Sequence, residues 1–432
     1  MTALSWITVA VFVTVYVFIA TEWVHRVAAA LAGAVVVLLL GATDAEHAFF
    51  SPEAGVDWNV IFLLVGMMLI VAVLKRTGVF EYLAIWAAKR AKGRPFRVMV
   101  ILVLVTAVVS AALDNVTTVL LVAPVTFLVC ERLGVPVVPF LIAEVLASNI
   151  GGAATLVGDP PNIIIASRSG LTFTDFLVVL GPFVLGVLVV FLGLCRWLFR
   201  AAFRYDPDRA AQIATLRERD AIRDRRLLIV SLIVLAVVLV AFLAHNVLHY
   251  EPSIVAVCGG LLLLGLSRLD AAEVARDVEW PTLVFFAGLF VMVGALVNTG
   301  VVDTVARAAI DATDGRLWLG SMVLLWGSAA LSAIIDNIPY VATMSPIVDQ
   351  MVDAGPDSGQ ARALWWALAI GADLGGNATA VGASANVVVL GIAARAGKPI
   401  SFWQFTRYGL IVAVITVALA VPYLYLRFFA FA

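Results

Sequence analysis

Apolar residues follow one another in long runs along this chain, and short polar or charged loops separate the runs. A helix that crosses a membrane needs about 20 predominantly apolar residues. The runs at 4–20, 24–42 and 58–74 therefore predict three membrane-spanning helices, and the run at 176–199 predicts a further one. The amphipathic stretch 80–91 ends in basic residues, which is typical of a helix lying along the membrane surface.

Two polar residues interrupt the apolar segment that follows. Asp114 and Asn115 separate the runs 98–113 and 116–130, and each run is short for a full crossing. This pattern predicts a re-entrant helical hairpin with its tip at the two polar residues. Two complete spans are the alternative, but they would give each half of the chain an even number of crossings and place its basic loops on opposite sides of the membrane.

A second interruption lies in the stretch 147–166, which reads ASNIGGAATLVGDPPNIIIA. Its glycines, paired prolines, asparagines and aspartate break a helix and leave backbone groups unpaired. Such a backbone survives at membrane depth only where protein buries it or where it lines a cavity. The stretch therefore predicts a broken helix at a solute-binding site.

The second half of the chain repeats this organisation. LDNVTTVLLVAP, which begins at Leu113, matches IDNIPYVATMSP, which begins at Ile335, with a displacement of 335 − 113 = 222. SNIGGAATLVGDPPN at Ser148 matches ADLGGNATAVGASAN at Ala372, with a displacement of 372 − 148 = 224. Chance similarity of apolar sequence would not keep the polar and glycine positions in register, so the pattern indicates a duplication.

With the hairpins counted as non-crossing, each half crosses the membrane an odd number of times, so the second repeat is inverted relative to the first. The predicted fold is an all-α membrane protein of about ten transmembrane helices, two re-entrant hairpins and two broken helices. Its predicted parts are a first repeat over 1–205 with hairpin 98–132, broken helix 137–168 and span 176–199, a cytoplasmic linker over 206–226, and a second repeat over 227–432 with hairpin 317–353, broken helix 361–396 and span 406–426.

Composition agrees with a multi-span membrane protein, because 63% of the residues are hydrophobic and 13% are charged. A net charge of −1 gives no reason to expect a nucleic-acid partner. The chain lacks a phosphate-binding GxxxxGK[ST] loop, zinc-type Cys/His spacing and a Ser/His/Asp grouping in its apolar segments, so we expect neither an enzyme nor a bound cofactor.

Basic residues predict the orientation in the cell membrane. The segment 75–97 holds seven Lys or Arg and one acid, and 200–226 holds eight against five, whereas 43–57 holds four acids and no Lys or Arg. Basic loops face the cytoplasm. Both termini are therefore predicted outside.

The four helix interruptions carry the candidate chemistry. Aspartates fall at all four of them, and a carboxylate inside a membrane protein is functional by default. Free N–H groups at half-helix N-termini and carbonyls at C-terminal ends add donors and acceptors. We expect Asn115 to cap the outgoing hairpin arm, and Asp159 to cap the half-helix that starts at Pro160. Corresponding parts in the second half are assigned to Asn337, Ser384 and Asn386.

The predicted substrate and ion site comprises Asp114, Asn115, Thr117, Asn149, Gly151, Gly152, Thr155, Gly158, Asp159, Asn162, Asp336, Asn337, Asp373, Gly375, Gly376, Asn377, Thr379, Ser384 and Asn386. Either a proton or Na⁺ is the expected coupling ion, with Asp114, Asn149, Asp336 and Asp373 as the expected sodium ligands. Lys and Arg are absent from the interior of both hairpins and both broken motifs, and the nearest ones, Arg132, Arg168 and Arg395, lie at the ends. This favours a cation, or a neutral or weakly charged solute, over a doubly charged anion.

Three long motifs, LDNVTTVLLVAPVT, LIAEVLASNIGG and LWWALAIGADLGGNATAVGASANVV, make the chain resemble the ion transporter superfamily. The resemblance covers nearly the whole chain. It points to the branch that holds arsenite/antimonite efflux pumps, sodium/proton antiporters and the P-protein, and the motifs look most similar to P-protein-type permeases. The likeness implies an elevator-type carrier, often a homodimer, with its site at the two Asp-Asn tips and the two broken helices. An arsenite pump would also imply association with a soluble ATPase subunit.

These patterns predict a secondary active transporter that moves a small inorganic ion or oxyacid with proton or sodium coupling. Arsenite-type efflux is the first expectation for its solute. A sodium/proton antiporter and an anion or small carboxylate transporter are the alternatives of the same class. An ion channel is the alternative from a different class.

Overall fold

The computed structural model describes the whole chain except residues 22, 52–53, 210–216, 246–249, 356–358 and 431–432. The described residues form helices and loops, with no strand among them. The first half holds α1 (Ala3–Thr21), α2 (Arg26–Leu39), α3 (Ala45–Phe50), α4 (Trp58–Lys75), α5 (Val79–Arg90), α6 (Pro95–Ala112), α7 (Asn115–Leu133), α8 (Val138–Gly152), α9 (Pro160–Ser169), α10 (Phe173–Leu198) and η1 (Arg200–Ala202). The second holds η2 (Glu218–Ala221), α12 (Arg225–Leu243), α14 (Pro252–Ser267), α15 (Ala271–Arg276), α16 (Trp280–Asn298), α17 (Val301–Ala312), α18 (Leu317–Ser332), α19 (Asn337–Asp353), α20 (Ala363–Gly375), α21 (Ser384–Arg395), α22 (Phe402–Leu424) and η3 (Tyr425–Phe429).

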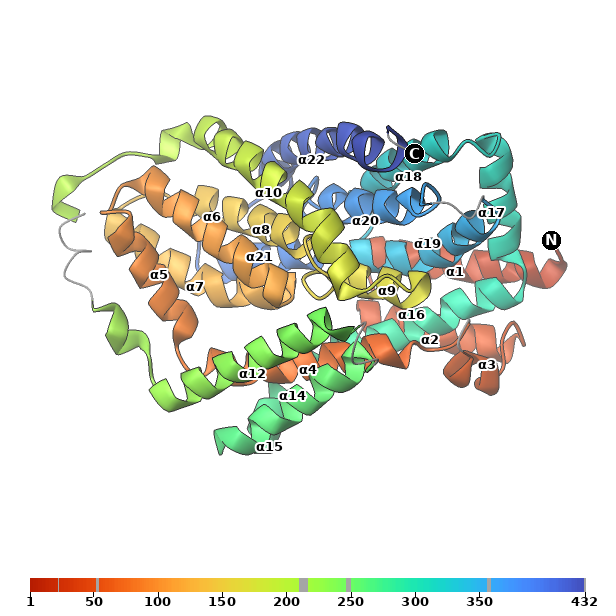
Figure 1. The fold of residues 1–432 in the computed structure, drawn as a ribbon, viewed down its shortest axis with the longest axis horizontal. Coiled ribbons are helices and arrows are strands. Elements are labelled where there is room, and N and C mark those ends of the chain that lie inside the picture. Colours follow the sequence, from red (N-terminus) through yellow and green to blue (C-terminus); the bar gives the residue numbers. More distant parts are fainter. Residues whose placement is uncertain (22, 52–53, 210–216, 246–249, 356–358, 431–432) are drawn as a thin grey trace.

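Helices of the two halves follow one another in the same order, so that α4 to α10 correspond to α16 to α22. Figure 1 shows corresponding helices at opposite ends of the molecule: α5 lies at the left and α17 at the right, whereas α3 lies at the right and α15 at the left. The two halves are therefore arranged upside down relative to each other.

Among the described residues, seven helices are long and apolar enough to cross a membrane by length and composition: α4, α6, α7, α10, α12, α16 and the continuous segment Phe402–Phe429. The predicted spans at 4–20 and 24–42 correspond to shorter apolar helices, Ala3–Ile19 and Arg26–Leu39. Both arms of the first predicted hairpin are longer than the sequence indicated, at 18 residues for α6 and 19 for α7. Their junction is nevertheless enclosed by protein, because Asn115 at the start of α7 is buried.

A frame of four helices joins the two halves. α4 packs along α14, and α2 packs along α16, so each pair takes one helix from each half. Gly66 of α4 lies so close to α14 that a Cβ atom there would be 2.3 Å from the backbone carbon of Ala256. Small residues permit such close helix crossings within a membrane.

The hairpin arms and half-helices form a second group. α6 packs on α8 and α18 packs on α20, each within its own half. The outgoing arms cross over, because α7 packs on α21 and α19 packs on α9. This exchange brings the four helix interruptions together in the interior.

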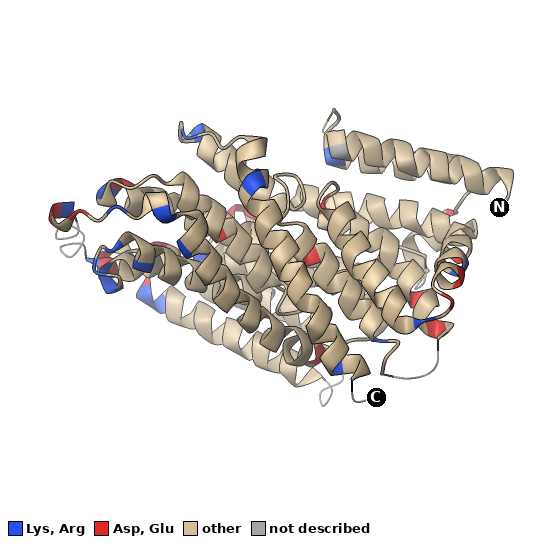
Figure 2. Ribbon diagram, turned by 90° about the horizontal axis from the view of Figure 1, so that it is seen from above, with Lys and Arg blue, Asp and Glu red and all other residues tan. Residues whose placement is uncertain are grey.

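Lys and Arg residues gather at the end of the molecule that holds α5 (Figure 2). The described part of the predicted linker lies on that helix: Lys89 Nζ donates to Glu218 Oε2 at 2.5 Å, and Arg223 Nη2 donates to Glu81 Oε1 at 3.3 Å. Positions 210–216 of the linker fall outside the described residues.

Candidate transport site

The side chain of Asn149, at the end of α8, connects both halves of the protein. Its Nδ2 donates to Asn377 Oδ1 at 3.0 Å and to Asn386 Oδ1 at 3.1 Å, and its Oδ1 accepts from Asn115 Nδ2 at 3.2 Å. All four side chains are buried. The structure thus brings four of the predicted site residues into one amide network at the centre.

Asp159 stands at the N-cap position of α9, as predicted, but its side chain makes no capping hydrogen bond. Its two carboxylate oxygens instead accept from Asn337 Nδ2 of the other half, at 3.3 and 3.4 Å. The predicted capping role is therefore wrong. The physical reason is the crossing of α19 over α9, which places an amide donor beside the carboxylate.

Asp373 near the end of α20 is fully buried, and neither of its carboxylate oxygens has a hydrogen-bond partner among the described residues. Asn162 lies beside it, but the Nδ2 of Asn162 donates to the carbonyl of Thr155 at 3.1 Å. Asp159 is close enough for the two carboxylates to repel each other. A buried donor, Asn377 Nδ2, is also unpartnered in the described structure. The centre thus has both acceptors and a donor available to a ligand.

Aspartates, and not the following asparagines, cap the hairpin arms. Asp114 Oδ1 accepts from the backbone N–H of Thr117 at 2.7 Å, and Asp336 Oδ1 accepts from that of Ile338 at 3.2 Å. The expectation that Asn115 caps its arm is wrong, because Asn115 is already the first helical residue and its amide points to Asn149. Thr117 contributes its backbone N–H to this cap.

The tip of the second hairpin meets a basic residue that sequence reasoning missed. Arg26, the first residue of α2, donates from Nη1 to Ser384 Oγ at 2.8 Å, and the same Nη1 lies 3.9 Å from Asp336 Oδ2. Ser384 Oγ in turn donates to Asp336 Oδ2. Arg26 lies outside both hairpins and both broken motifs, so the pattern of the motifs could not reveal it. Its position at the start of an apolar run is also typical of an ordinary interfacial residue.

The environment of Arg26 includes an aromatic ring and a carboxyl group. Its guanidinium carbon lies 5.7 Å from the centroid of the Phe285 ring. Burial raises the pKa of Glu279, the residue before α16, to about 7; the negative charge of Asp114 acts in the same direction, whereas Thr282 and Arg26 act against it. Arg26 thus lies among acidic groups at one edge of the site.

The predicted glycines contribute close backbone packing. A Cβ on Gly152 would lie 2.6 Å from the carbonyl oxygen of Gly158, and one on Gly376 would lie 2.9 Å from that of Gly382. Similar short approaches, to Ala107 and Ala329 on the neighbouring hairpin arms, involve Gly151 and Gly375. These glycines let the interrupted chain turn back against itself.

Threonine and asparagine side chains fix both loops between the half-helices. Thr155 Oγ1 donates to the carbonyl of Ala111 at 2.6 Å, and Thr379 Oγ1 donates to that of Ala333 at 2.5 Å. Asn386 Nδ2 donates to the carbonyls of Gly376 at 2.8 Å and Thr379 at 2.9 Å. Each loop is therefore tied to the hairpin of its own half.

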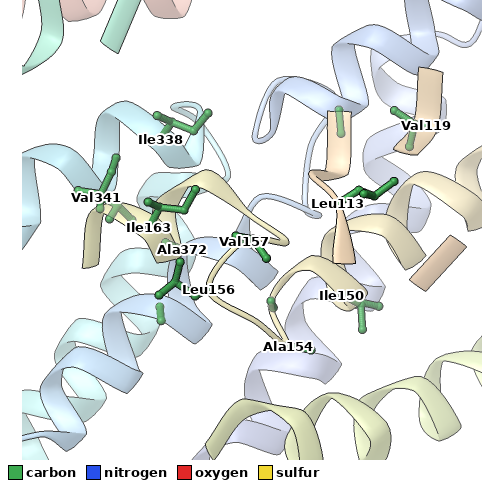
Figure 3. Packing of buried hydrophobic residues seen from close by; sticks show 14 of the residues in the cluster. Leu113, Val119, Ile150, Ala154, Leu156, Val157, Ile163, Ile338, Val341 and Ala372 are labelled. Carbon is green, nitrogen blue, oxygen red and sulfur yellow. The ribbon is translucent and has the colours of Figure 1, made fainter. Parts of the chain in front are cut away.

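Apolar side chains surround this polar centre. Figure 3 shows Ile163 of α9 beside Ile338 and Val341 of α19, with Leu156 of the first loop and Ala372 of α20 nearby. All five are buried. In such surroundings, electrostatic interactions between the buried polar groups are stronger than in water.

Within the part of the chain that the structure describes, no three His, Cys, Asp or Glu residues lie together as a metal-binding group. The four expected sodium ligands occupy different places: Asp114 and Asp336 cap hairpin arms, Asn149 joins the amides, and Asp373 is unpartnered. A sodium site could still use amide and carbonyl oxygens. The sodium assignment stays a prediction.

Known proteins similar to this chain are membrane proteins and transporters. A 46 kDa membrane protein of Mycobacterium leprae is 57% identical over 98% of this chain and 99% of its own length. An uncharacterized transporter of Mycobacterium tuberculosis is 56% identical over 99% of this chain and 100% of its own. The human P protein is 33% identical over 97% of this chain and 59% of its own.

A solved structure has the same fold. The YdaH transporter of Alcanivorax borkumensis, described as having an unusual topology, superposes with a TM-score of 0.59 at 17% identity, covering 90% of this chain and 87% of that one. The family model described as a citrate transporter, CitMHS, matches residues 16–371. This fold and this family are those of a transporter and not of an enzyme. The chain therefore belongs to the CitMHS citrate transporter family and is a multi-pass membrane transporter.

Proposed function

We propose that this protein is a secondary active transporter in which Asp159 and Asp373 bind the coupling cation, a proton or Na⁺. The unpartnered carboxylate of Asp373 is the observation that carries this proposal. An isolated buried carboxylate is strongly unfavourable unless a cation or a proton compensates it. The nearby carboxylate of Asp159 adds repulsion that a bound cation would relieve.

For the transported solute, we propose a small oxygen-rich ion or acid. α9 begins with Pro160 and Pro161, which have no N–H, but the N-terminus of α21 carries no side-chain cap, and its backbone N–H groups can bind oxygen atoms. The unpartnered Nδ2 of Asn377 adds a donor beside them. Arsenous acid and small carboxylates both offer suitable oxygens.

A small carboxylate is supported by the family model that matches the chain, because that model is described as a citrate transporter.

We further propose that the hairpins and half-helices move as a unit against the frame of α2, α4, α14 and α16, as in an elevator carrier. The packing of arms on half-helices and of frame helices on each other supports two such bodies. The basic end shown in Figure 2 would face the cytoplasm, with both termini outside the cell membrane. The homodimer and the ATPase partner stay predictions.

Flux measurements on the purified protein in proteoliposomes test the function. Uptake of citrate, arsenite, Na⁺ and chloride is measured in parallel, with and without a pH gradient and with and without a sodium gradient. We expect saturable uptake of one solute that follows one gradient and shows counterflow. Unitary currents that are independent of both gradients would instead indicate a channel, and uptake of Na⁺ against a pH gradient alone would indicate a sodium/proton antiporter.

A further inference from the structure

Arg26 connects the frame to the moving elements of the proposed mechanism. It begins α2, a frame helix, whereas Asp336 and Ser384 belong to the second hairpin tip and to α21. The Arg26 side chain is 39% exposed and that of Asp336 is 17% exposed. The contact is therefore accessible to ions and is not sealed in the core.

A cavity of about 340 Å³ gives this access. Arg26, Asp336 and Ser384 all line it, together with Phe285 of α16 and Val388 of α21. It lies between a frame helix and a half-helix, which is where a movement between the two groups would open or close it.

Both carboxylate oxygens of Asp336 have partners in this arrangement. Oδ1 accepts the backbone N–H of Ile338, while Oδ2 accepts the hydroxyl of Ser384 and faces Nη1 of Arg26. The guanidinium donates to Ser384 and approaches Asp336 only to 3.9 Å, so the ion pair lacks a direct hydrogen bond. Such a pair is weaker than a bidentate arginine–carboxylate pair and is easier to replace.

Within the described residues, the first half shows no equivalent of this contact. Its hairpin tip carries the corresponding Asp114, but the helix that corresponds to α2 begins with Pro252, and Pro160 stands where α21 has Ser384. In the part of the chain that the structure describes, an arginine therefore ties the second hairpin tip to the frame and not the first.

We propose that Arg26 is a built-in counter-cation that occupies a cation site at Asp336 and Ser384, and that a proton or Na⁺ must displace it there. One positive charge leaves Asp336 as another arrives, so the exchange leaves the charge at the tip unchanged. Displacement frees α21 and the hairpin tip from α2, whereas without a cation the ion pair holds the two groups together. This inference rests on the proposed cation-coupled function.

Other ionisable groups lie around Asp336, so the effects of pH and of Na⁺ have to be measured separately. His25 lines the same cavity, Glu279 lies near Arg26, and Asp159 and Tyr16 interact electrostatically with Asp336. Na⁺ is therefore varied at one fixed pH, and pH is varied separately without Na⁺.

Labelling of a cysteine in the cavity tests the displacement without relying on transport. Val388→Cys is introduced together with Cys258→Ser, because Cys258 is the exposed native cysteine. An impermeant maleimide is applied to the purified protein over a series of Na⁺ concentrations. At fixed pH we expect Na⁺ to raise the labelling rate about tenfold, a coupling of ordinary size for two linked sites. Maleimide reacts with the thiolate, and acid lowers the thiolate fraction, so each rate measured at a different pH is divided by the rate of a free thiol at that pH. This ratio should rise by a similar factor in acid. Adding Arg26→Gln should give fast labelling at every concentration, and Arg307→Gln, at an exposed site on α17, should behave like the parent.

The outcomes separate the inference from the function. Labelling that ignores both Na⁺ and pH, or that keeps its cation dependence in Arg26→Gln, would overturn the role of Arg26. The same holds if Arg26→Gln changes only the citrate concentration needed for half-maximal uptake, since Arg26 would then bind an anion. Failure of the proposed function shows separately, as an absence of gradient-driven flux in the parent protein.

Discussion

The two halves share several hydrogen bonds and differ in the polar groups that they place at the candidate transport site. Ser110 Oγ donates to the carbonyl of Ser148 at 2.8 Å, and Ser332 Oγ donates to that of Ala372 at 2.7 Å. The bond of Thr155 to the first hairpin likewise has its counterpart at Thr379. These two bonds between a hairpin and its own broken helix are thus the same in both halves.

The aspartates of the two broken helices do not stand at corresponding positions. Asn149 corresponds to Asp373, and Asp159 corresponds to Ala383, so each half supplies one carboxylate from a non-equivalent place. The asparagines at the tips also differ, because Asn115 binds Asn149 of its own half whereas Asn337 binds Asp159 of the other. Duplication accounts for the hydrogen bonds that the two halves share. Divergence of a few polar residues makes the site asymmetric.

The largest effect should follow removal of either carboxylate. We expect Asp373→Asn or Asp159→Asn to lower gradient-driven flux about 100-fold or more, because each removes a charge that would bind the coupling cation. Initial rates of uptake in proteoliposomes measure this. Asp311→Asn, at an exposed position of α17, serves as the matched control and should transport normally.

Moving the carboxylate between the halves sharpens the test. The double variant Asn149→Asp, Asp373→Asn keeps the number of acids but shifts one to the equivalent place. We expect it to stay inactive, because Asn149 is needed as an amide donor to Asn377 and Asn386. Recovery of flux would mean that the two positions are interchangeable, against the asymmetry described above.

A smaller effect is expected where the halves are alike. Gly152→Ala should destabilise the protein by about 1–3 kcal/mol, because the new methyl group overpacks against the carbonyl of Gly158. Gly376→Ala should cost less, since its closest approach is 2.9 Å and not 2.6 Å. Thermal unfolding in detergent measures both, with Gly186→Ala on α10 as the control because no atom lies within 4 Å of its Cβ position. Equal stability of Gly152→Ala and the control would contradict this packing.

The smallest effect should come from the linker, which lies outside the repeat. The hydrogen bond from Lys89 lowers the pKa of Glu218 below its usual value, so this pair stabilises the fold above the unfolded pKa of about 4.3 and loses that effect as the pH falls. Glu218→Gln should lower Tm only slightly at neutral pH, because the pair is on the surface. The difference in Tm should shrink as the pH falls through the lowered pKa of Glu218, and a difference that does not change with pH would contradict an ionic origin.

Much of the fold could be predicted from the sequence, because the polar interruptions recur at nearly the same displacement, 222 and 224 positions, and apolar runs have a defined length. The helix breaks after Gly152 and before Pro160 lie within the motif that predicted them. The lengths of the hairpin arms were harder to predict, since each helix continues past its apolar run into charged residues. α6, for example, begins at Pro95, before the apolar run.

Individual contacts within the site could not be predicted, since they depend on how distant helices cross. Asp159 occupies a capping position, yet it binds Asn337, which lies 178 residues further along the chain. Arg26 contacts Ser384 across 358 residues. A pattern within one motif holds no information on either partner.

The pairing of α4 with α14 and of α2 with α16 has a consequence for how such a chain could have arisen. Each pair takes its helices from different halves, so a polypeptide of half this length would leave these four surfaces uncovered. Only a second copy inserted upside down in the same membrane could cover them. An ancestral half-length protein with this architecture would therefore have had to insert in both orientations, and fusion of two copies would have fixed one orientation for each.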